Sequence, residues 1–179
     1  MRKYFSLLIR GFLLGSAALI AACAGYSGSN LKPGVAMLPD VVASMGEPAM
    51  RWKDADGREQ LAYPRGPAGT QTYMAFIAVD GKLERIEPVL NMEHFSRIER
   101  DKSDQAAVLR LLGPSPSQWT AYFKARDELV WEWRFCDPWN EMAFFDVLFD
   151  GTTGIVRTTY QRPDSPGSDR GRSGCGQSS

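Results

Sequence analysis

The sequence predicts an α+β protein made of two tandem copies of one unit, in which two short helices precede an antiparallel meander of three strands. Three observations lead to this prediction. Apolar residues first recur at helical spacing and then alternate, as they do in strands. The helical stretches end at Gly46 and Gly113, and glycine is the commonest residue just past a helix. The same order of signals occurs twice, so we expect antiparallel sheet with the helices packed on one face.

The first copy begins with GVAMLPDVVASMGEPAMRW and the second with DKSDQAAVLRLLGPSPSQW. Four landmarks align the copies, and their spacing grows slowly from 67 to 70 residues, as small insertions in loops would make it. The pattern predicts repeat 1 over residues 33–90 and repeat 2 over residues 91–162. The aligned pairs are Gly46 with Gly113, Trp52 with Trp119, Leu61 with Leu129, and Asp80-Gly81 with Asp150-Gly151.

Helical spacing in the first copy places Leu38, Val41, Val42 and Met45 on one face. In the second copy the buried stripe consists of Val108, Leu111 and Leu112, and Asn91 is a candidate cap for an earlier short helix. This earlier helix has no clear counterpart in the first copy, where a proline and a glycine leave little room for one.

The strands are predicted from the alternation of apolar residues, which puts every second side chain on the same face of a sheet. The face expected beneath the helices carries Phe145, Val147 and Phe149, with Ala75, Ile77 and Val79 in the first copy. The opposite face, which no predicted helix covers, carries Phe144, Asp146 and Leu148, with Met74, Phe76 and Ala78 in the first copy.

Residues 1–22 resemble a signal peptide. Arg2 and Lys3 supply positive charge, and the apolar run GFLLGSAALIAA is too short to span a bilayer comfortably. Ile20-Ala21-Ala22 before Cys23 resembles the bacterial lipobox, in which a peptidase cuts before a cysteine whose thiol has been acylated. Two alternatives are an ordinary secretory signal with an incidental cysteine and an uncleaved anchor. Several acyl chains on Cys23 would hold the protein stably on a membrane.

The two ends of the mature chain have the composition of flexible segments. Residues 23–32 hold the lipidated cysteine and a Gly/Ser-rich tether, and residues 163–179 are expected to be a disordered tail. By resemblance to enterobacterial lipoproteins, Ala24 after the cysteine favours sorting to the outer membrane. Cys136 and Cys175 could form a disulfide in an oxidising compartment, and the sequence leaves this pairing open.

Composition and motifs disfavour several classes of function. Removal of residues 1–22 leaves 18 basic and 21 acidic residues, a net charge of about −3, which argues against nucleic-acid binding. His94 is the single histidine, for which a solvent-facing or capping role is the simplest interpretation. We identify no nucleophile motif, phosphate-binding glycine loop or cysteine pair with metal-ligand spacing. We therefore expect no catalytic residues, no metal and no cofactor.

The helix-closing pattern resembles that of the BamE (SmpA/OmlA) family of small outer-membrane lipoproteins. The residues that carry the resemblance are Val42, Met45, Gly46 and Pro48 in the first copy, and Leu112, Gly113, Pro116 and the VWEWRF strand in the second. The tandem arrangement also resembles the β-lactamase inhibitory protein, in which two such units share a sheet. The chain departs from the family by having two units and one extra residue between Gly113 and Pro116.

These observations favour a lipid-anchored, non-catalytic binding module on the periplasmic side of the outer membrane. The resemblance implies a partner among envelope proteins, with a role in the assembly of outer-membrane proteins or in envelope integrity. The alternative is an inhibitor or sensor that binds a periplasmic enzyme through the open face of the sheet. The sequence leaves the oligomeric state open. Exposed aromatic residues often mark partner sites, and the candidate binding residues are Trp139, Phe144, Asp146, Leu148, Met74 and Phe76.

The lipobox-like segment predicts that replacement of Cys23 by alanine abolishes lipidation, because the thiol is the group that is acylated. Growth with a fatty-acid analogue should label the wild-type protein and leave Cys23→Ala unlabelled, as an unprocessed or soluble species. Equal labelling of the two proteins would show that the lipid is attached elsewhere.

Overall fold

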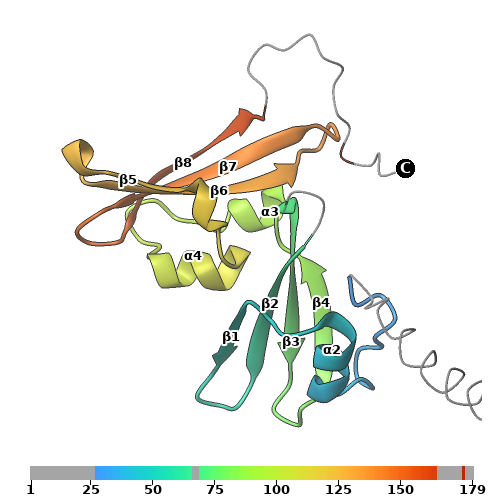
Figure 1. Cartoon of the computed structure of the whole chain (residues 1–179). Coiled ribbons are helices and arrows are strands. Elements are labelled where there is room, and N and C mark those ends of the chain that lie inside the picture. Colours follow the sequence, from blue (N-terminus) through green and yellow to red (C-terminus); the bar gives the residue numbers. More distant parts are fainter. Residues whose placement is uncertain (1–26, 66–68, 165–174, 176–179) are drawn as a thin grey trace, which may run out of the picture.

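The computed structural model describes residues 27–65, 69–164 and 175. The protein is of the α+β class, with one four-stranded antiparallel sheet in each half of the chain (Figure 1). The first half contains α2 (Leu38–Met45), β1 (Met50–Lys53), β2 (Glu59–Arg65), β3 (Gln71–Ile77) and β4 (Leu83–Pro88). The second contains α3 (Met92–Phe95), α4 (Gln105–Leu112), the 3-10 turns η3 (Ser117–Trp119) and η4 (Lys124–Arg126), β5 (Thr120–Phe123), β6 (Glu128–Cys136), β7 (Met142–Asp150) and β8 (Val156–Pro163).

Each sheet has one strand more than the sequence predicted. The strand order is β1-β2-β3-β4 in one sheet and β5-β6-β7-β8 in the other, and the added strands, β1 and β5, are four residues long. The sequence of β5, TAYF, does not alternate apolar and polar residues, so it gives no signal of a strand. All four of its residues are exposed. Within residues 27–65, α2 is the only helix before β1, because the chain leading to it forms turns.

Equivalent backbone hydrogen bonds occur within each half of the chain. They form in the turn before the helix, between that turn and the last strand, and at the end of the helix. The equivalent residues in and before the two helices are 67 positions apart. The corresponding N–H to C=O bonds are Gly34 to Leu83 and Asp101 to Val156, Leu83 to Ala36 and Val156 to Ser103, Leu38 to Gly81 and Gln105 to Gly154, and Gly46 to Val42 and Gly113 to Leu109.

Two of the predicted landmarks are misaligned. In the hydrogen-bond pattern the counterpart of Gly81 is Gly154 rather than Gly151, because the turn between β7 and β8 is longer than that between β3 and β4. Trp52 lies in β1 whereas Trp119 lies in η3, before β5 begins, so these tryptophans occupy different positions. The insertions therefore fall in more places than the sequence alignment allowed.

A separate apolar core joins each helix to its own sheet. The first core contains Ala36, Val41, Met45, Leu61, Tyr63, Ala75, Ile77 and Leu83. The second contains Leu90, Phe95, Val108, Leu112, Trp133, Phe135, Ala143, Phe145, Val147, Phe149 and Val156. Most residues expected beneath the helices are found there. Val79 is an exception, because it lies in the turn after β3 and is 65% exposed.

Helix α4 lies between the two sheets (Figure 1). Its apolar side, with Val108 and Leu112, belongs to the second core. At its other side the amide of Gln60, on β2, donates to the carbonyl oxygen of Arg110 at 2.5 Å. The Arg110 guanidinium lies 2.8 Å from the carboxylate of Asp54. The outer face of the first sheet is therefore partly covered by the second half of the chain.

Both ends of the folded part differ from the predicted boundaries. Gly28 is buried and Leu31 packs against the first core, so the tether is shorter than residues 23–32. At the other end, residues up to Pro163 belong to β8, and Cys175 forms a disulfide with Cys136. Cys23, together with residues 165–174 and 176–179 of the predicted tail, lies outside the described residues.

Gly46 and Gly113 end their helices as predicted, with φ of 83° and 76°. Their ψ values are close to 180°, a combination of angles that is almost restricted to glycine. The surroundings differ. A Cβ on Gly113 would lie 2.8 Å from Cγ2 of Thr72, whereas a Cβ on Gly46 would lie 3.8 Å from the flexible side chain of Arg65.

This difference predicts unequal costs for the same substitution. Gly46→Ala should lower the free energy of unfolding by about 1–3 kcal/mol through backbone strain. Gly113→Ala should cost more, because its methyl group also pushes α4 away from β3. Urea unfolding of both variants measures the difference. Equal losses of unfolding free energy would mean that α4 can move away from β3 without destabilising the protein.

Candidate binding surface

The outer face of the second sheet carries three of the six predicted binding residues. Helices α3 and α4 lie on one side of this sheet, and no α-helix of the described residues packs on the other side, which only Trp119 of the 3-10 turn η3 reaches (Figure 1). Strand alternation places Phe144, Asp146 and Leu148 there, paired with Arg162, Tyr160 and Thr158 of β8.

Two of these three predicted binding residues are buried, in contrast to the expectation. Phe144 packs edge-on against Trp119, with 5.3 Å between ring centroids, and the Arg162 guanidinium lies 4.3 Å above its ring. Asp146 is 0% exposed. Leu148 is only partly buried. Long neighbouring side chains thus cover the centre of the face, which strand alternation alone does not reveal.

Arg162 is the residue that closes this face. Its guanidinium lies 2.8 Å from the Asp146 carboxylate and 2.9 Å from the Glu132 carboxylate. Burial raises the pKa of the Asp146 carboxyl above its ordinary value, and the charge of Arg162 opposes this shift. Arg162 therefore neutralises a carboxylate that would be costly to bury alone.

The predicted residues of the first sheet are divided between a buried and a partly exposed position. Met74 is fully buried at the junction with α4, so it cannot contact a partner. Phe76 is partly exposed, and the Arg85 guanidinium lies 3.6 Å from its ring centroid. The expectation of an open face in the first copy is wrong because α4 occupies part of it.

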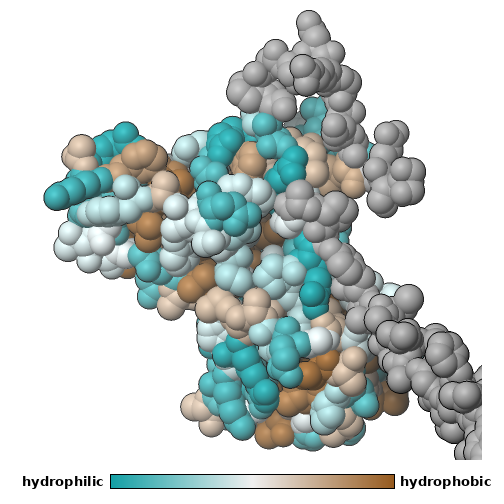
Figure 2. Space-filling view, in the orientation of Figure 1, coloured by the Kyte–Doolittle hydropathy of each residue, from teal (hydrophilic) through white to brown (hydrophobic). Residues whose placement is uncertain are grey.

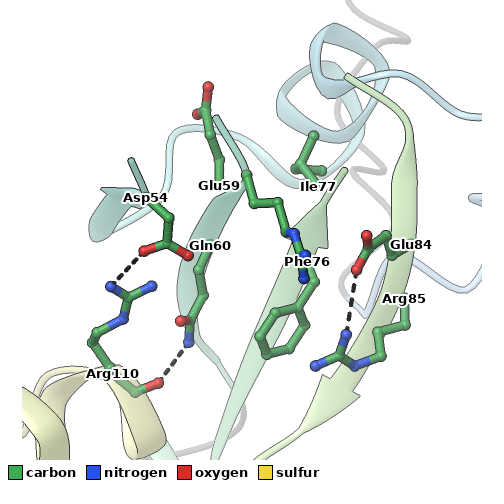
Figure 3. Close-up of a pocket in the computed structure, with 9 residues that line it drawn as sticks. Asp54, Glu59, Gln60, Phe76, Ile77, Glu84, Arg85 and Arg110 are labelled. Atoms are coloured by element: carbon green, nitrogen blue, oxygen red, sulfur yellow. Dashed lines mark hydrogen bonds and ion pairs between the residues drawn. The ribbon is translucent and has the colours of Figure 1, made fainter. Parts of the chain in front are cut away.

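Beside Phe76 lies a cavity of about 240 Å³ at the outer face of the first sheet (Figure 3). Its arginines already have acidic partners, at 2.8 Å between Arg110 and Asp54 and 3.5 Å between Arg85 and Glu84. These ion pairs lie in the cavity wall, where a carboxylate balances the charge of each of these two arginines. The lining residues are Asp54, Arg58, Glu59, Gln60, Phe76, Ile77, Glu84, Arg85 and Arg110.

Trp139 differs from the other candidates because it is 79% exposed. It lies in the tight turn between β6 and β7, where Oδ1 of Asp137 accepts hydrogen bonds from the backbone N–H groups of Trp139 and Glu141. Asn140 takes a left-handed conformation with φ of 61°. The turn therefore has a defined backbone although its tryptophan is in solvent.

The disulfide holds the base of the same turn. Cys136 ends β6 and is bonded to Cys175, with 5.8 Å between their Cα atoms. The N–H of Cys175 also donates to the carbonyl oxygen of Asn140 at 3.3 Å. Sequence reasoning left this pairing open because nothing in the tail sequence shows where Cys175 lies. The bond leaves Cys136 without a free thiol in this structure.

His94 is buried rather than facing solvent. Its Nδ1 lies 2.9 Å from Oδ1 of Asn91, the residue that caps α3, and its Nε2 lies 3.7 Å from a carboxylate oxygen of Glu87. These contacts fix the start of the second half, which is a structural role.

Four aromatic side chains of the described residues are substantially exposed, and all lie in the second half: Tyr122, Phe123, Trp139 and Tyr160. Within the described part of the chain no cluster of three metal-binding side chains occurs. The helices of the same part are too short and too polar to cross a bilayer. The site with the clearest geometry for a partner is consequently the turn that carries Trp139.

Comparisons with models of protein families, with curated proteins and with solved structures find no match.

Arg162, the partner of Asp146, was not among the predicted site residues. One signal was present, because an aspartate between Phe144 and Leu148 in a strand of apolar residues needs a compensating charge if it is buried. The position of β8 relative to β7, which decides that Arg162 supplies this charge, depends on the irregular pairing at Leu148/Phe149.

The ion pair predicts a specific order of stabilities. Arg162→Ala should lower the free energy of unfolding by about 3 kcal/mol at neutral pH, because it leaves Asp146 buried and unpaired. Removal of the arginine raises the pKa of Asp146 further, so the penalty is full above that pKa and fades as the pH falls below it.

Adding Asp146→Asn to Arg162→Ala should restore part of the loss, because no buried charge remains. Chemical unfolding of the single and double variants at neutral and acidic pH measures both effects. A loss that is independent of pH and of Asp146→Asn would show that Arg162 acts through packing on Phe144 alone.

Proposed function

We propose that the protein is a lipid-anchored, non-catalytic binding module of the cell envelope, which captures a partner protein with its second half. The exposed Trp139 carries this proposal. Tryptophan is enriched among residues that dominate protein interfaces, because it buries a large area while losing little side-chain freedom. Asp137 and the disulfide fix the backbone on which it stands, so little further ordering is needed on binding.

Two independent features support an envelope location. The segment Ile20-Ala21-Ala22-Cys23 has the residue types of a lipobox behind an apolar run. Cys136 and Cys175 lie at disulfide distance, and such bonds persist in oxidising compartments such as the periplasm. On the resemblance of the two halves to BamE units, the proposed partner is a subunit of outer-membrane protein assembly at the periplasmic side of the outer membrane.

The outer face of the second sheet is less suited to an inhibitor or sensor than the sequence suggested. A partner there would meet Arg162 and Glu132 above Phe144 and Asp146, and would have to disturb their ion pairs to reach the apolar surface. The Trp139 turn requires no such rearrangement, so we place the binding site there.

Photo-crosslinking in growing cells tests the proposal. A photoreactive phenylalanine analogue at position 139 should give a discrete crosslinked species, whereas the same analogue at position 123, an exposed aromatic site in the same half, should not. Mass spectrometry of the species then distinguishes an assembly subunit from a soluble periplasmic enzyme.

Trp139→Ala should weaken capture of that partner by roughly thirtyfold, equivalent to about 2 kcal/mol. Thermal unfolding should be unchanged, because the side chain is in solvent. Phe123→Ala is the control and should retain the partner. Equal capture by Trp139→Ala and wild-type protein would remove Trp139 from the interface.

A further inference from the structure

The first described residues restrict how far the folded protein can move from its membrane anchor. A Cβ on Gly28 would lie 2.6 Å from Cδ1 of Ile86 and 2.9 Å from Sδ of Met45, so the backbone of Gly28 is pressed against the first core. The Asn30 side chain accepts a hydrogen bond from Ser44, and the N–H of Leu31 donates to the carbonyl oxygen of Gly28. The chain is fixed from Gly28 onward.

Gly28 follows Cys23 by only five positions. Fully extended, this segment spans at most about 18 Å. A lipid on Cys23 therefore keeps Gly28, which packs on the first core, within this distance of the bilayer. The first half must lie close to the lipid surface, and the remaining question is which of its surfaces faces the lipid.

Three exposed large apolar side chains occur among the described residues of the first half, and they share one end of it. Val79 lies in the turn between β3 and β4, and Met37 pairs with Lys82 of that turn. Val35 precedes Ala36, whose carbonyl oxygen accepts from Leu83 at the start of β4. Val35 is 71% exposed. Figure 2 shows apolar surface gathered at this end, at the bottom of the view.

Charged residues of both signs flank this apolar end, and three of them are lysines. Lys32 precedes Val35, Lys53 ends β1 and Lys82 lies in the turn with Val79, and all three are exposed. Lysine side chains extend their apolar stems along such a surface while the ammonium groups reach lipid headgroups. Two of these ammonium groups already pair with carboxylates, Lys82 with Asp80 at 2.8 Å and Lys53 with Glu59 at 3.8 Å, so the exposed apolar side chains rather than a net positive charge favour a lipid surface here. The combination is suited to a bilayer interface.

The anchor can reach this end. Gly28 packs on Ile86, which lies three residues along β4 from Leu83, a rise of about 10 Å. The segment from Gly28 back to Cys23 can extend about 18 Å, which exceeds that distance, so acyl chains on Cys23 can enter a bilayer that touches the turns of the first half.

We propose that the end of the first half formed by Val35, Met37 and Val79 rests on the bilayer that holds the Cys23 lipid. This inference depends on the lipid anchor of the proposed function. The strands of the first sheet then stand upright on the membrane. The second half, which lies at the opposite end of that sheet, extends into the aqueous space with the Trp139 turn (Figure 1).

The test uses the full lipidated protein in vesicles of phosphatidylethanolamine and phosphatidylglycerol that contain a lipid brominated in its acyl chains. An environment-sensitive fluorophore is attached to Val35→Cys. The matched control is Lys102→Cys, because Lys102 is exposed and occupies the position equivalent to Val35 in the second half. The label at position 35 should be quenched and blue-shifted, and the label at position 102 should show neither effect.

Adding Val79→Asp should reduce the quenching at position 35, because a carboxylate then faces the acyl chains. Unquenched fluorescence at position 35 in protein that floats with the vesicles and carries fatty acid on Cys23 would overturn this inference and leave the anchor intact. Equal quenching at positions 35 and 102 would also overturn it. Protein without fatty acid on Cys23 would overturn both the anchor and the orientation derived from it.

Discussion

The close approach of α4 to the first sheet is the contact on which the arrangement of the two halves depends. Gly113 ends α4 at a point where a side chain would collide with Thr72 of β3. A side chain at this position would push α4 away from β3, and with it the Arg110 carbonyl oxygen that accepts from Gln60 on β2. Helix α2 also ends at a glycine, but a Cβ on Gly46 would meet only the flexible side chain of an arginine. Gly113 therefore both ends α4 and allows α4 to pack closely against the first sheet.

This double use explains how far the sequence could predict the fold. The helix ends at Gly46 and Gly113, the α+β class and most core positions follow from local patterns, because each depends on residues close together in the chain. The extra edge strands do not, since β5 is held by its hydrogen bonds to β6 rather than by burial of its own side chains. The burial of Met74 likewise depends on α4, which lies far along the chain from β3.

The candidate site was only partly predictable for the same reason. Alternation identified the outer face of the second sheet, but the side chains of neighbouring strands decide whether such a face is open. Arg162 covers Phe144 and neutralises Asp146, and Trp119 of η3 packs edge-on against Phe144, so the face is closed without any α-helix over it. Trp139 was predictable as exposed because it lies between a proline and an asparagine in a turn, whereas the disulfide that holds its base was not.

The two proposed contacts place different demands on the two halves. A lipid surface needs no specific geometry, and the first half offers it exposed valine, methionine and lysine side chains at one end of its sheet. A protein partner needs a defined shape, and the second half offers a tryptophan on a turn fixed by Asp137 and the Cys136–Cys175 bond. Because α4 joins the sheets through buried contacts, an orientation imposed on the first half at the membrane also determines the direction in which Trp139 points.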